Sequence, residues 1–146
     1  MTSLDLAQIQ QLIPHRPPFL WIDRVIEVSD SSILAEKYIS PDLPLFQGHY
    51  PEFPVFPGVL QCEMAMQAGA ILIARTVTVE PGQVPVATRI NNVKFKNPIR
   101  PGMTVRIAAD LTERLANAFF FTAKLTVEGK TTATLEFACT AAPLQA

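Results

Sequence analysis

The chain has 146 residues, of which 49% are hydrophobic and 17% are charged, and its formal net charge is −1. This length predicts one domain with a single hydrophobic core, spanning residues 1–146. The near-neutral charge excludes strong electrostatic binding of nucleic acid, which needs a clearly basic face, and the high apolar content favours partial coverage of the surface by another subunit.

The first part of the chain predicts a short helix followed by a β-hairpin. Leucines and an isoleucine recur at helical spacing over residues 4–12, with Thr2-Ser3 as possible caps and Pro14 as a terminator. Two β-rich runs follow at residues 20–28 and 33–39, and the polar stretch between them predicts a turn.

A proline-rich loop then leads into the longest predicted helix. Pro51, Pro54 and Pro57 each fix φ and bias the preceding residue toward extended backbone, so His49 lies on a stiff segment. Pro57 suits the first turn of a helix. Residues 59–74 contain no proline and are dominated by good helix formers, which predicts the helix itself.

The rest of the chain predicts strands joined by short connections. A turn is expected at residues 80–82, and strands at residues 84–95, 104–112, 118–127 and 131–140. Sequential strands with short connections favour an antiparallel sheet, and the single apolar helix must then lie across it. The sequence therefore predicts an α+β fold.

Two polar side chains interrupt the apolar helix. Glu63 and Gln67 are four residues apart and share one helix face, so Gln67 can hold the carboxyl group by a hydrogen bond. Burial favours the protonated form of a carboxyl group, which can donate a proton, and a neutral imidazole at His49 can accept one. The amides of Gly58 and Val59 at the helix start suit a carbonyl oxygen that gains negative charge.

Three parts of the chain carry a resemblance to a known family. Its centre runs from Gly48-His49-Tyr50-Pro51 through Pro57-Gly58-Val59-Leu60 and Glu63 to Gln67-Ala68, and the other parts are residues 12–25 and 93–102. Together they resemble the FabZ-type 3-hydroxyacyl-[acyl-carrier-protein] dehydratases, in the same order and over nearly the whole chain. The resemblance implies the hotdog fold, in which an antiparallel β-sheet wraps around a long central helix, and a fold that dimerises.

The resemblance also implies a reaction. A (3R)-3-hydroxyacyl-[acyl-carrier-protein] would be dehydrated reversibly to the trans-2-enoyl product, in fatty acid or related lipid biosynthesis. His49 would take the proton from C2 and Glu63 would protonate the leaving C3 hydroxyl. Gln67 would orient Glu63, and the Gly58 N–H would hold the thioester oxygen. In the family the paired His and Glu come from different subunits of a dimer.

The partners implied are acyl carrier protein and a second copy of the chain, with a hexamer built as a trimer of dimers as a further possibility. Neither a metal nor an organic cofactor is expected, because the thioester itself carries the activation. The phosphopantetheine arm belongs to the substrate. The central apolar run is too polar to span a membrane. The lone cysteines Cys62 and Cys139 indicate a reducing compartment, so a cytoplasmic protein is expected.

Other residues near the motif have two interpretations. Phe56, Val59, Met64 and Met66 could line a tunnel for the acyl tail, or could simply pack in the core or at a subunit interface.

The turn that contains His15 and Arg16 is assigned to the scaffold, with Arg16 expected to pair with a carboxylate such as Asp23. For the whole protein, a non-catalytic acyl-binding hotdog subunit and a hotdog acyl-thioesterase remain the alternatives to a dehydratase.

Overall fold

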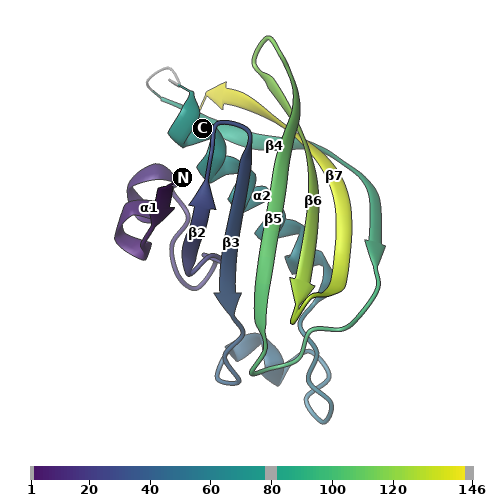
Figure 1. The fold of residues 1–146 in the computed structure, drawn as a ribbon. Coiled ribbons are helices and arrows are strands. Elements are labelled where there is room, and N and C mark those ends of the chain that lie inside the picture. The colour runs from purple at the N-terminus through teal and green to yellow at the C-terminus, as the bar shows by residue number, and fades with distance from the viewer. Residues whose placement is uncertain (1, 78–81, 144–146) are drawn as a thin grey trace.

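The computed structural model describes residues 2–77 and 82–143. Within them, seven strands form one antiparallel sheet in the order β1-β2-β3-β5-β6-β7-β4 (Figure 1). The strands are β1 (Thr2–Leu4), β2 (Arg24–Val28), β3 (Ser32–Tyr38), β4 (Gln83–Phe95), β5 (Thr104–Leu115), β6 (Ala118–Val127) and β7 (Lys130–Pro143). The helices are α1 (Leu6–Leu12), the 3-10 turn η1 (Pro44–Gln47) and α2 (Gly58–Thr76). This arrangement confirms the predicted α+β fold.

Helix α2 is the centre of the molecule, and the curved sheet wraps around it (Figure 1). It begins at Gly58, directly after Pro57, which is the N-cap residue instead of lying in the first turn. Eleven of its residues are buried. The helix can be apolar nearly all round because the sheet covers most of its surface. The predicted buried helix is confirmed, and it is slightly longer than expected at each end.

The core shows why a glycine stands inside this helix. The rings of Phe121 on β6 and Phe137 on β7 stack at 4.9 Å, and a Cβ at Gly69 would lie 2.9 Å from the Phe137 ring. A side chain there would push the helix off the sheet. Along β6, Phe119 and Phe121 are buried, whereas Phe120 lies on the other face of the strand and is partly exposed.

The N-terminal segment differs from its prediction. Residues Thr2–Leu4 form strand β1, paired antiparallel with β2, so the expected capping by Thr2 and Ser3 is wrong. Helix α1 begins after Asp5, whose carboxylate accepts a hydrogen bond from the Gln8 N–H at 2.8 Å, while the Asp5 N–H donates to the Gln8 side chain at 2.9 Å. This capping box starts the helix two residues later than predicted.

The predicted strand at residues 20–28 also begins later, at Arg24. Leu20, Trp21 and Ile22 are buried all the same. The Trp21 N–H donates to the Gln67 side chain on α2, so at that residue this segment is tied to the helix instead of to the sheet. These apolar residues pack in the core without pairing in the sheet. Aromatic and β-branched residues are also typical of strands, which explains why the pattern predicted a longer strand.

The remaining strands agree with their predictions to within three residues at either end. Of the turn expected at residues 80–82, Glu80 and Pro81 lie outside the described residues. Gly82 has φ +82°, a left-handed conformation that glycine adopts without strain.

Candidate active site

The first functional element is the pair formed by Glu63 and Gln67 on α2. As the spacing predicts, the Gln67 Nε2 group donates to Glu63 Oε2 at 3.0 Å. The Gln67 side chain is fully buried, whereas the Glu63 side chain retains 23% of its exposure. The carboxyl group is therefore held in place at the edge of the core and can still reach a ligand.

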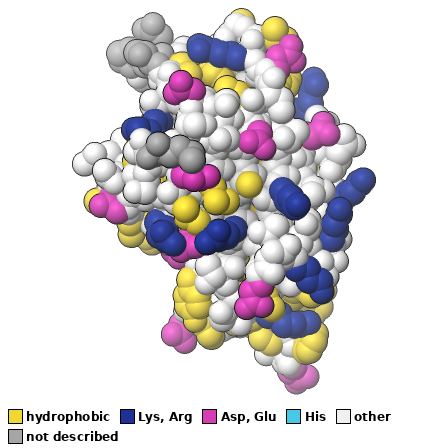
Figure 2. Space-filling model, in the orientation of Figure 1, with side chains coloured by type: hydrophobic (Ala, Val, Ile, Leu, Met, Phe, Trp, Pro, Cys, Tyr) yellow, Lys and Arg dark blue, Asp and Glu magenta, His cyan; other side chains and the backbone are white. Residues whose placement is uncertain are grey.

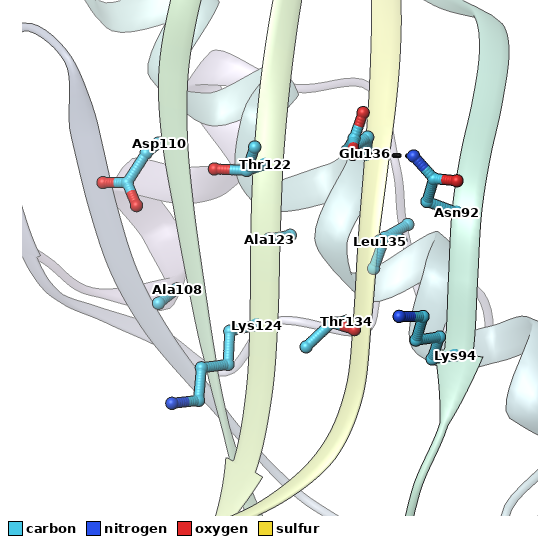
Figure 3. A pocket seen from close by; sticks show the side chains of 10 residues that line it. All are labelled: Asn92, Lys94, Ala108, Asp110, Thr122, Ala123, Lys124, Thr134, Leu135 and Glu136. Carbon is cyan, nitrogen blue, oxygen red and sulfur yellow. Dashed lines mark hydrogen bonds between the residues drawn. The ribbon is translucent and has the colours of Figure 1, made fainter.

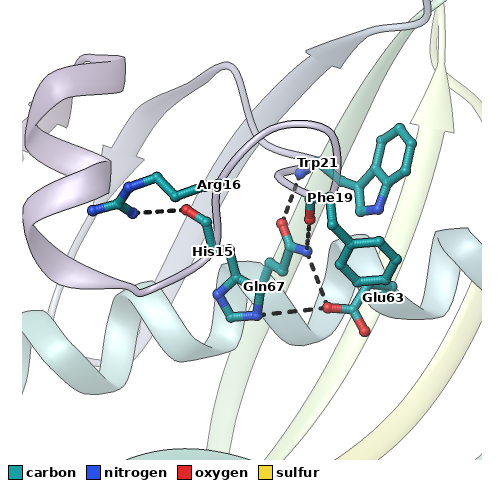
Figure 4. A network of polar contacts seen from close by, with 6 residues as sticks. All are labelled: His15, Arg16, Phe19, Trp21, Glu63 and Gln67. Carbon is teal, nitrogen blue, oxygen red and sulfur yellow. Dashed lines mark hydrogen bonds and ion pairs between the residues drawn. The ribbon is translucent and has the colours of Figure 1, made fainter. Parts of the chain in front are cut away.

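Gln67 is itself fixed by the segment before β2 (Figure 4). Its Oε1 accepts from the Trp21 N–H at 2.8 Å, and its Nε2 donates to the Phe19 carbonyl oxygen at 2.9 Å. Because a backbone N–H can only donate, these contacts determine which end of the amide faces Glu63. The amide must present its N–H to the carboxyl group.

His15 lies beside the same carboxyl group. Its Nε2 is 3.8 Å from Glu63 Oε2, and Figure 4 shows the ring directed toward Glu63 from the loop that follows α1. The sequence predicted a scaffold role for His15 and no contact with Glu63. Nothing in the spacing of the two residues predicts it, because the contact depends on how the loop packs against α2.

The expected pairing of Arg16 with Asp23 is wrong. The Arg16 guanidinium donates to the carbonyl oxygens of Gln10, Ile13 and His15 at 2.7–2.9 Å. Asp23 instead accepts from the Lys37 side chain at 2.9 Å and, with its other oxygen, from a backbone N–H on β3. Arg16 therefore closes the loop that carries His15.

His49 lies on the proline-rich loop before α2. Its Nδ1 is 2.7 Å from the Val55 carbonyl oxygen, and its backbone N–H donates to the Leu45 carbonyl oxygen at 3.0 Å. A carbonyl oxygen can only accept, so Nδ1 carries the proton and Nε2 keeps its lone pair. In this tautomer His49 is able to take up a proton at Nε2.

The loop under His49 is braced from the neighbouring turn. The Arg100 guanidinium donates to the Pro54 carbonyl oxygen at 3.2 Å and lies 3.9 Å above the centre of the Phe53 ring. The Phe56 N–H donates to the Ile99 carbonyl oxygen at 2.8 Å. These contacts support the predicted stiffness of the loop.

A cavity of about 230 Å³ opens beside Glu63. It is lined by His15, Glu63, Met66, Ala70, Pro85, Val86, Ala87 and Cys139. His49 is not among these residues. A single chain therefore lines this cavity with the carboxyl group of Glu63 but not with the histidine of the predicted pair.

The predicted tunnel residues occupy three kinds of position. Met66 lines the cavity beside Glu63, Phe56 and Met64 are buried in the core, and Val59 is 71% exposed. At Gly58 an added Cβ would lie 3.1 Å from the ring of Phe95, so the helix start and β4 approach closely. The tunnel assignment stays a prediction.

Similarity to known proteins identifies the family of this chain. Residues 25–137 match the family model of the ApeI-like dehydratases, described as ApeI dehydratase. The 3-hydroxyacyl-[acyl-carrier-protein] dehydratase FabZ of Clostridium perfringens strain SM101 is 37% identical over 127 residues, which cover 87% of this chain and 91% of the relative. FabZ of Rickettsia akari is 38% identical over 135 residues, covering 92% and 93%. The chain belongs to this dehydratase family.

Solved structures of related shape give the fold. The dehydratase heterocomplex ApeI:P from Xenorhabdus doucetiae matches with a TM-score of 0.75 at 17% identity, covering 92% of this chain and 90% of that chain. A thioesterase from Haemophilus influenzae matches with a TM-score of 0.70 at 18% identity, covering 99% and 95%. The dehydratase therefore has the hotdog fold, as the resemblance implied.

Another hollow on the dehydratase lies away from the cavity beside Glu63. It measures about 660 Å³ and runs across the outer face of the sheet, on the side away from α2 (Figure 3). Asp110, Lys124 and Glu136 line it, and the Asn92 side chain donates to Glu136 at 2.9 Å. Both signs of charge alternate there, and none of the predicted site residues contributes to it.

Within residues 2–77 and 82–143 no helix is both long and apolar enough to cross a membrane. The same residues hold no cluster of three or more His, Cys, Asp or Glu side chains suited to a metal ion.

Cys139 forms part of the wall opposite Glu63. The pKa of its thiol is raised to about 12, first by burial and second by the negative charge of Glu63. An unperturbed thiol has a pKa of 9.0. Between those two values the folded dehydratase keeps a proton that the unfolded chain loses. The folded state then binds more protons than the unfolded state, so stability must fall as the pH rises through this window.

Replacing Cys139 with alanine should remove this pH dependence. We expect the free energy of unfolding of the wild type to fall more steeply above pH 9 than that of Cys139→Ala, by up to about 1.4 kcal/mol per pH unit. Urea unfolding of both proteins between pH 7 and pH 10.5 measures the two slopes. The alanine variant will be less stable throughout because of the cavity it creates, so only the difference in slope counts. Parallel curves would contradict the assignment.

Proposed function

We propose that this dehydratase removes water reversibly from a (3R)-3-hydroxyacyl-[acyl-carrier-protein] to give the trans-2-enoyl thioester. The observation that carries the proposal is Glu63, held by Gln67 at the edge of a cavity. The names of the FabZ relatives supply the substrate class. The remaining steps follow from the positions of the other residues.

In the proposed reaction His49 Nε2 takes the proton from C2 of the substrate. Its Nδ1–H remains bonded to the Val55 carbonyl oxygen, which orients the ring and stabilises the imidazolium that forms. The electron pair from the C2–H bond forms the C2–C3 double bond as the C3–O bond breaks. Glu63 gives its proton to the departing hydroxyl, so that water leaves.

The thioester oxygen gains negative charge as the proton leaves C2. An amide at the start of α2 points outward without a partner inside the helix, and the Gly58 N–H is the amide we assign to this oxygen. The absence of a side chain at Gly58 leaves room for the Phe95 ring beside the helix start.

We further propose that the working unit is a homodimer in which His49 of one protomer faces Glu63 of the other. Strand β4 is the last strand in the sheet order, and its neighbour among the described residues is β7 alone. It exposes Val86, Ile90, Val93 and Phe95, each by 36–53%. An outer strand that carries exposed apolar side chains is suited to pairing with a second copy. A hexamer remains an expectation from the resemblance.

The acyl carrier protein is the proposed protein partner. On the face shown in Figure 2, charges of both signs mix over the sheet, and apolar side chains gather at the lower end. The loop between β3 and α2 lies at that end in Figure 1. Tyr50 and Phe53 on this loop are 64% and 66% exposed, and Arg100 lies over Phe53. We assign carrier docking to this region, and a cytoplasmic location accords with that partner.

Incubation of the purified protein with a crotonyl thioester tests the reaction. We expect loss of the enoyl thioester absorbance with no release of free thiol, because hydration is the reverse of the proposed dehydration. Release of free thiol would instead indicate the thioesterase alternative. If neither signal appears, the non-catalytic acyl-binding subunit is the better description.

A further inference from the structure

His15 shares the cavity beside Glu63, and the proposed reaction as described so far does not use it. The two side chains are 27% and 23% exposed, with His15 Nε2 3.8 Å from Glu63 Oε2. This separation exceeds a hydrogen bond, but contacts of this kind commonly tighten when substrate fills a site. Partial burial also weakens the screening of any charge that forms on the carboxyl group.

The surroundings of the other ring nitrogen, Nδ1, determine the tautomer of His15. Nδ1 is buried and has no hydrogen-bond partner among the residues that the structure describes. A proton on Nδ1 would leave a buried N–H without an acceptor, which is costly. The favourable neutral form therefore carries its proton on Nε2, directed at Glu63.

The loop around His15 is held from two sides. Arg16 closes it by donating to the carbonyl oxygens of Gln10, Ile13 and His15 itself. Gln67 binds the following segment at Phe19 and Trp21 (Figure 4). His15 and Gln67 therefore approach Glu63 from one connected network, and their positions relative to the carboxyl group are set together.

The other residues that line the cavity beside Glu63 offer its carboxyl group neither a positive charge nor an N–H donor from a side chain. From β7 comes the Cys139 thiol, which stays protonated well above neutral pH. From β4 come Pro85, Val86 and Ala87, and from α2 come Met66 and Ala70. Among the described cavity residues, His15 is thus the side chain that can join Gln67 in donating an N–H to Glu63.

We propose that His15 is a positioning residue for Glu63. Its Nε2–H, together with the Gln67 amide, orients the carboxyl group and stabilises the carboxylate that Glu63 becomes after it has given its proton to the leaving hydroxyl. The inference rests on the proposed function, because it assigns His15 a part in the same proton transfer. His15 acts through Glu63 and does not itself exchange a proton with the substrate.

Two substitutions at His15 distinguish this role from simple packing. His15→Leu fills similar space without a donor, and His15→Gln keeps an N–H that cannot titrate. With a (3R)-3-hydroxybutyryl thioester, assayed in the dehydration direction by the appearance of the enoyl absorbance, we expect His15→Leu to lower kcat about 10-fold to 100-fold with KM changed less than about 2-fold, because the lost contact strengthens as Glu63 gives up its proton. His15→Gln should recover most of the lost rate. Gln11→Leu, an exposed position on α1, is the matched control and should behave as wild type.

The outcomes separate the two proposals. If the wild type dehydrates this thioester and His15→Leu has wild-type kcat, or if only KM changes, the role of His15 is refuted while the proposed function stands. If His15→Gln and His15→Leu lose the same amount of kcat, and circular dichroism shows both variants to be folded, the role of His15 is also refuted. If the wild type itself shows no turnover, the proposed function and this inference fail together.

A second readout does not depend on turnover. The chain contains only two histidines, and the structure assigns them opposite neutral tautomers, with the proton on Nδ1 in His49 and on Nε2 in His15. Nitrogen-15 NMR of histidine-labelled protein reports the tautomer directly, and His49→Ala identifies which signals belong to His15. A neutral His15 with its proton on Nδ1 would overturn the proposal.

Discussion

Replacing His49 with alanine, or Glu63 with glutamine, is expected to reduce hydration of a crotonyl thioester by about 10²-fold to 10⁴-fold each, the usual contribution of a general acid or base. In His49→Ala no group remains to exchange the C2 proton. In Glu63→Gln the shape and the contact with Gln67 can persist, but the amide cannot take the proton from the attacking water in hydration, or give one in dehydration. Steady-state rates at matched protein concentration measure both losses.

These variants must be shown to fold before their rates are interpreted. His49 is bonded to the Val55 carbonyl oxygen, so the alanine variant loses a loop contact as well as a base. Circular dichroism and size-exclusion chromatography check fold and assembly. Glu52→Gln is a suitable control because it removes an exposed acid from the same loop. Near-normal turnover in either site variant would show that the role assigned to that residue is wrong.

Combining the two inactive variants in one assembly is expected to restore activity. In a heterodimer of His49→Ala with Glu63→Gln, one site carries both substitutions and the other carries neither, provided that each site takes its histidine and its acid from different protomers. Co-expression with two different affinity tags and sequential purification isolates this heterodimer. We expect about half of the wild-type rate per dimer, since one of two equivalent sites is intact.

The same experiment tests the alternative that His49 and Glu63 of one protomer form a complete site. If His49 and Glu63 of one chain acted together, every site in the heterodimer would carry one of the two substitutions and the activity would stay at the level of the single variants. Tagged heterodimers of wild type with each single variant give the reference rates. In both of these heterodimers one of the two sites should remain active.

Much of the structure could be predicted because local physical rules act on neighbouring residues. The absence of proline and the helix-forming composition after Val59 predicted α2, and the four-residue spacing of Glu63 and Gln67 predicted their hydrogen bond, which is present at 3.0 Å. The later strands were predicted from β-rich runs between turn residues.

Where local patterns failed, a contact distant in sequence had replaced a local one. Residues Thr2–Leu4 were expected to begin a helix or cap it, but they pair with β2, a partner some twenty residues away that no local pattern reveals. The predicted strand that included Trp21 is shortened because the Trp21 N–H bonds to Gln67 across 46 positions. Arg16 was expected to pair with an acid because of its charge, but it donates to three carbonyl oxygens in α1 and the loop that follows.

The sequence alone determined helix α2, the strands that follow it and the stiff loop before it, together with the residue types able to give and take a proton. Each of these depends on residue type and short-range spacing. Only the tertiary structure decided which nitrogen of each histidine bears a proton, what holds Gln67, and that His15 stands beside Glu63. These properties depend on hydrogen bonds between segments that meet only when the sheet closes around α2, and burial then makes each of those bonds costly to break.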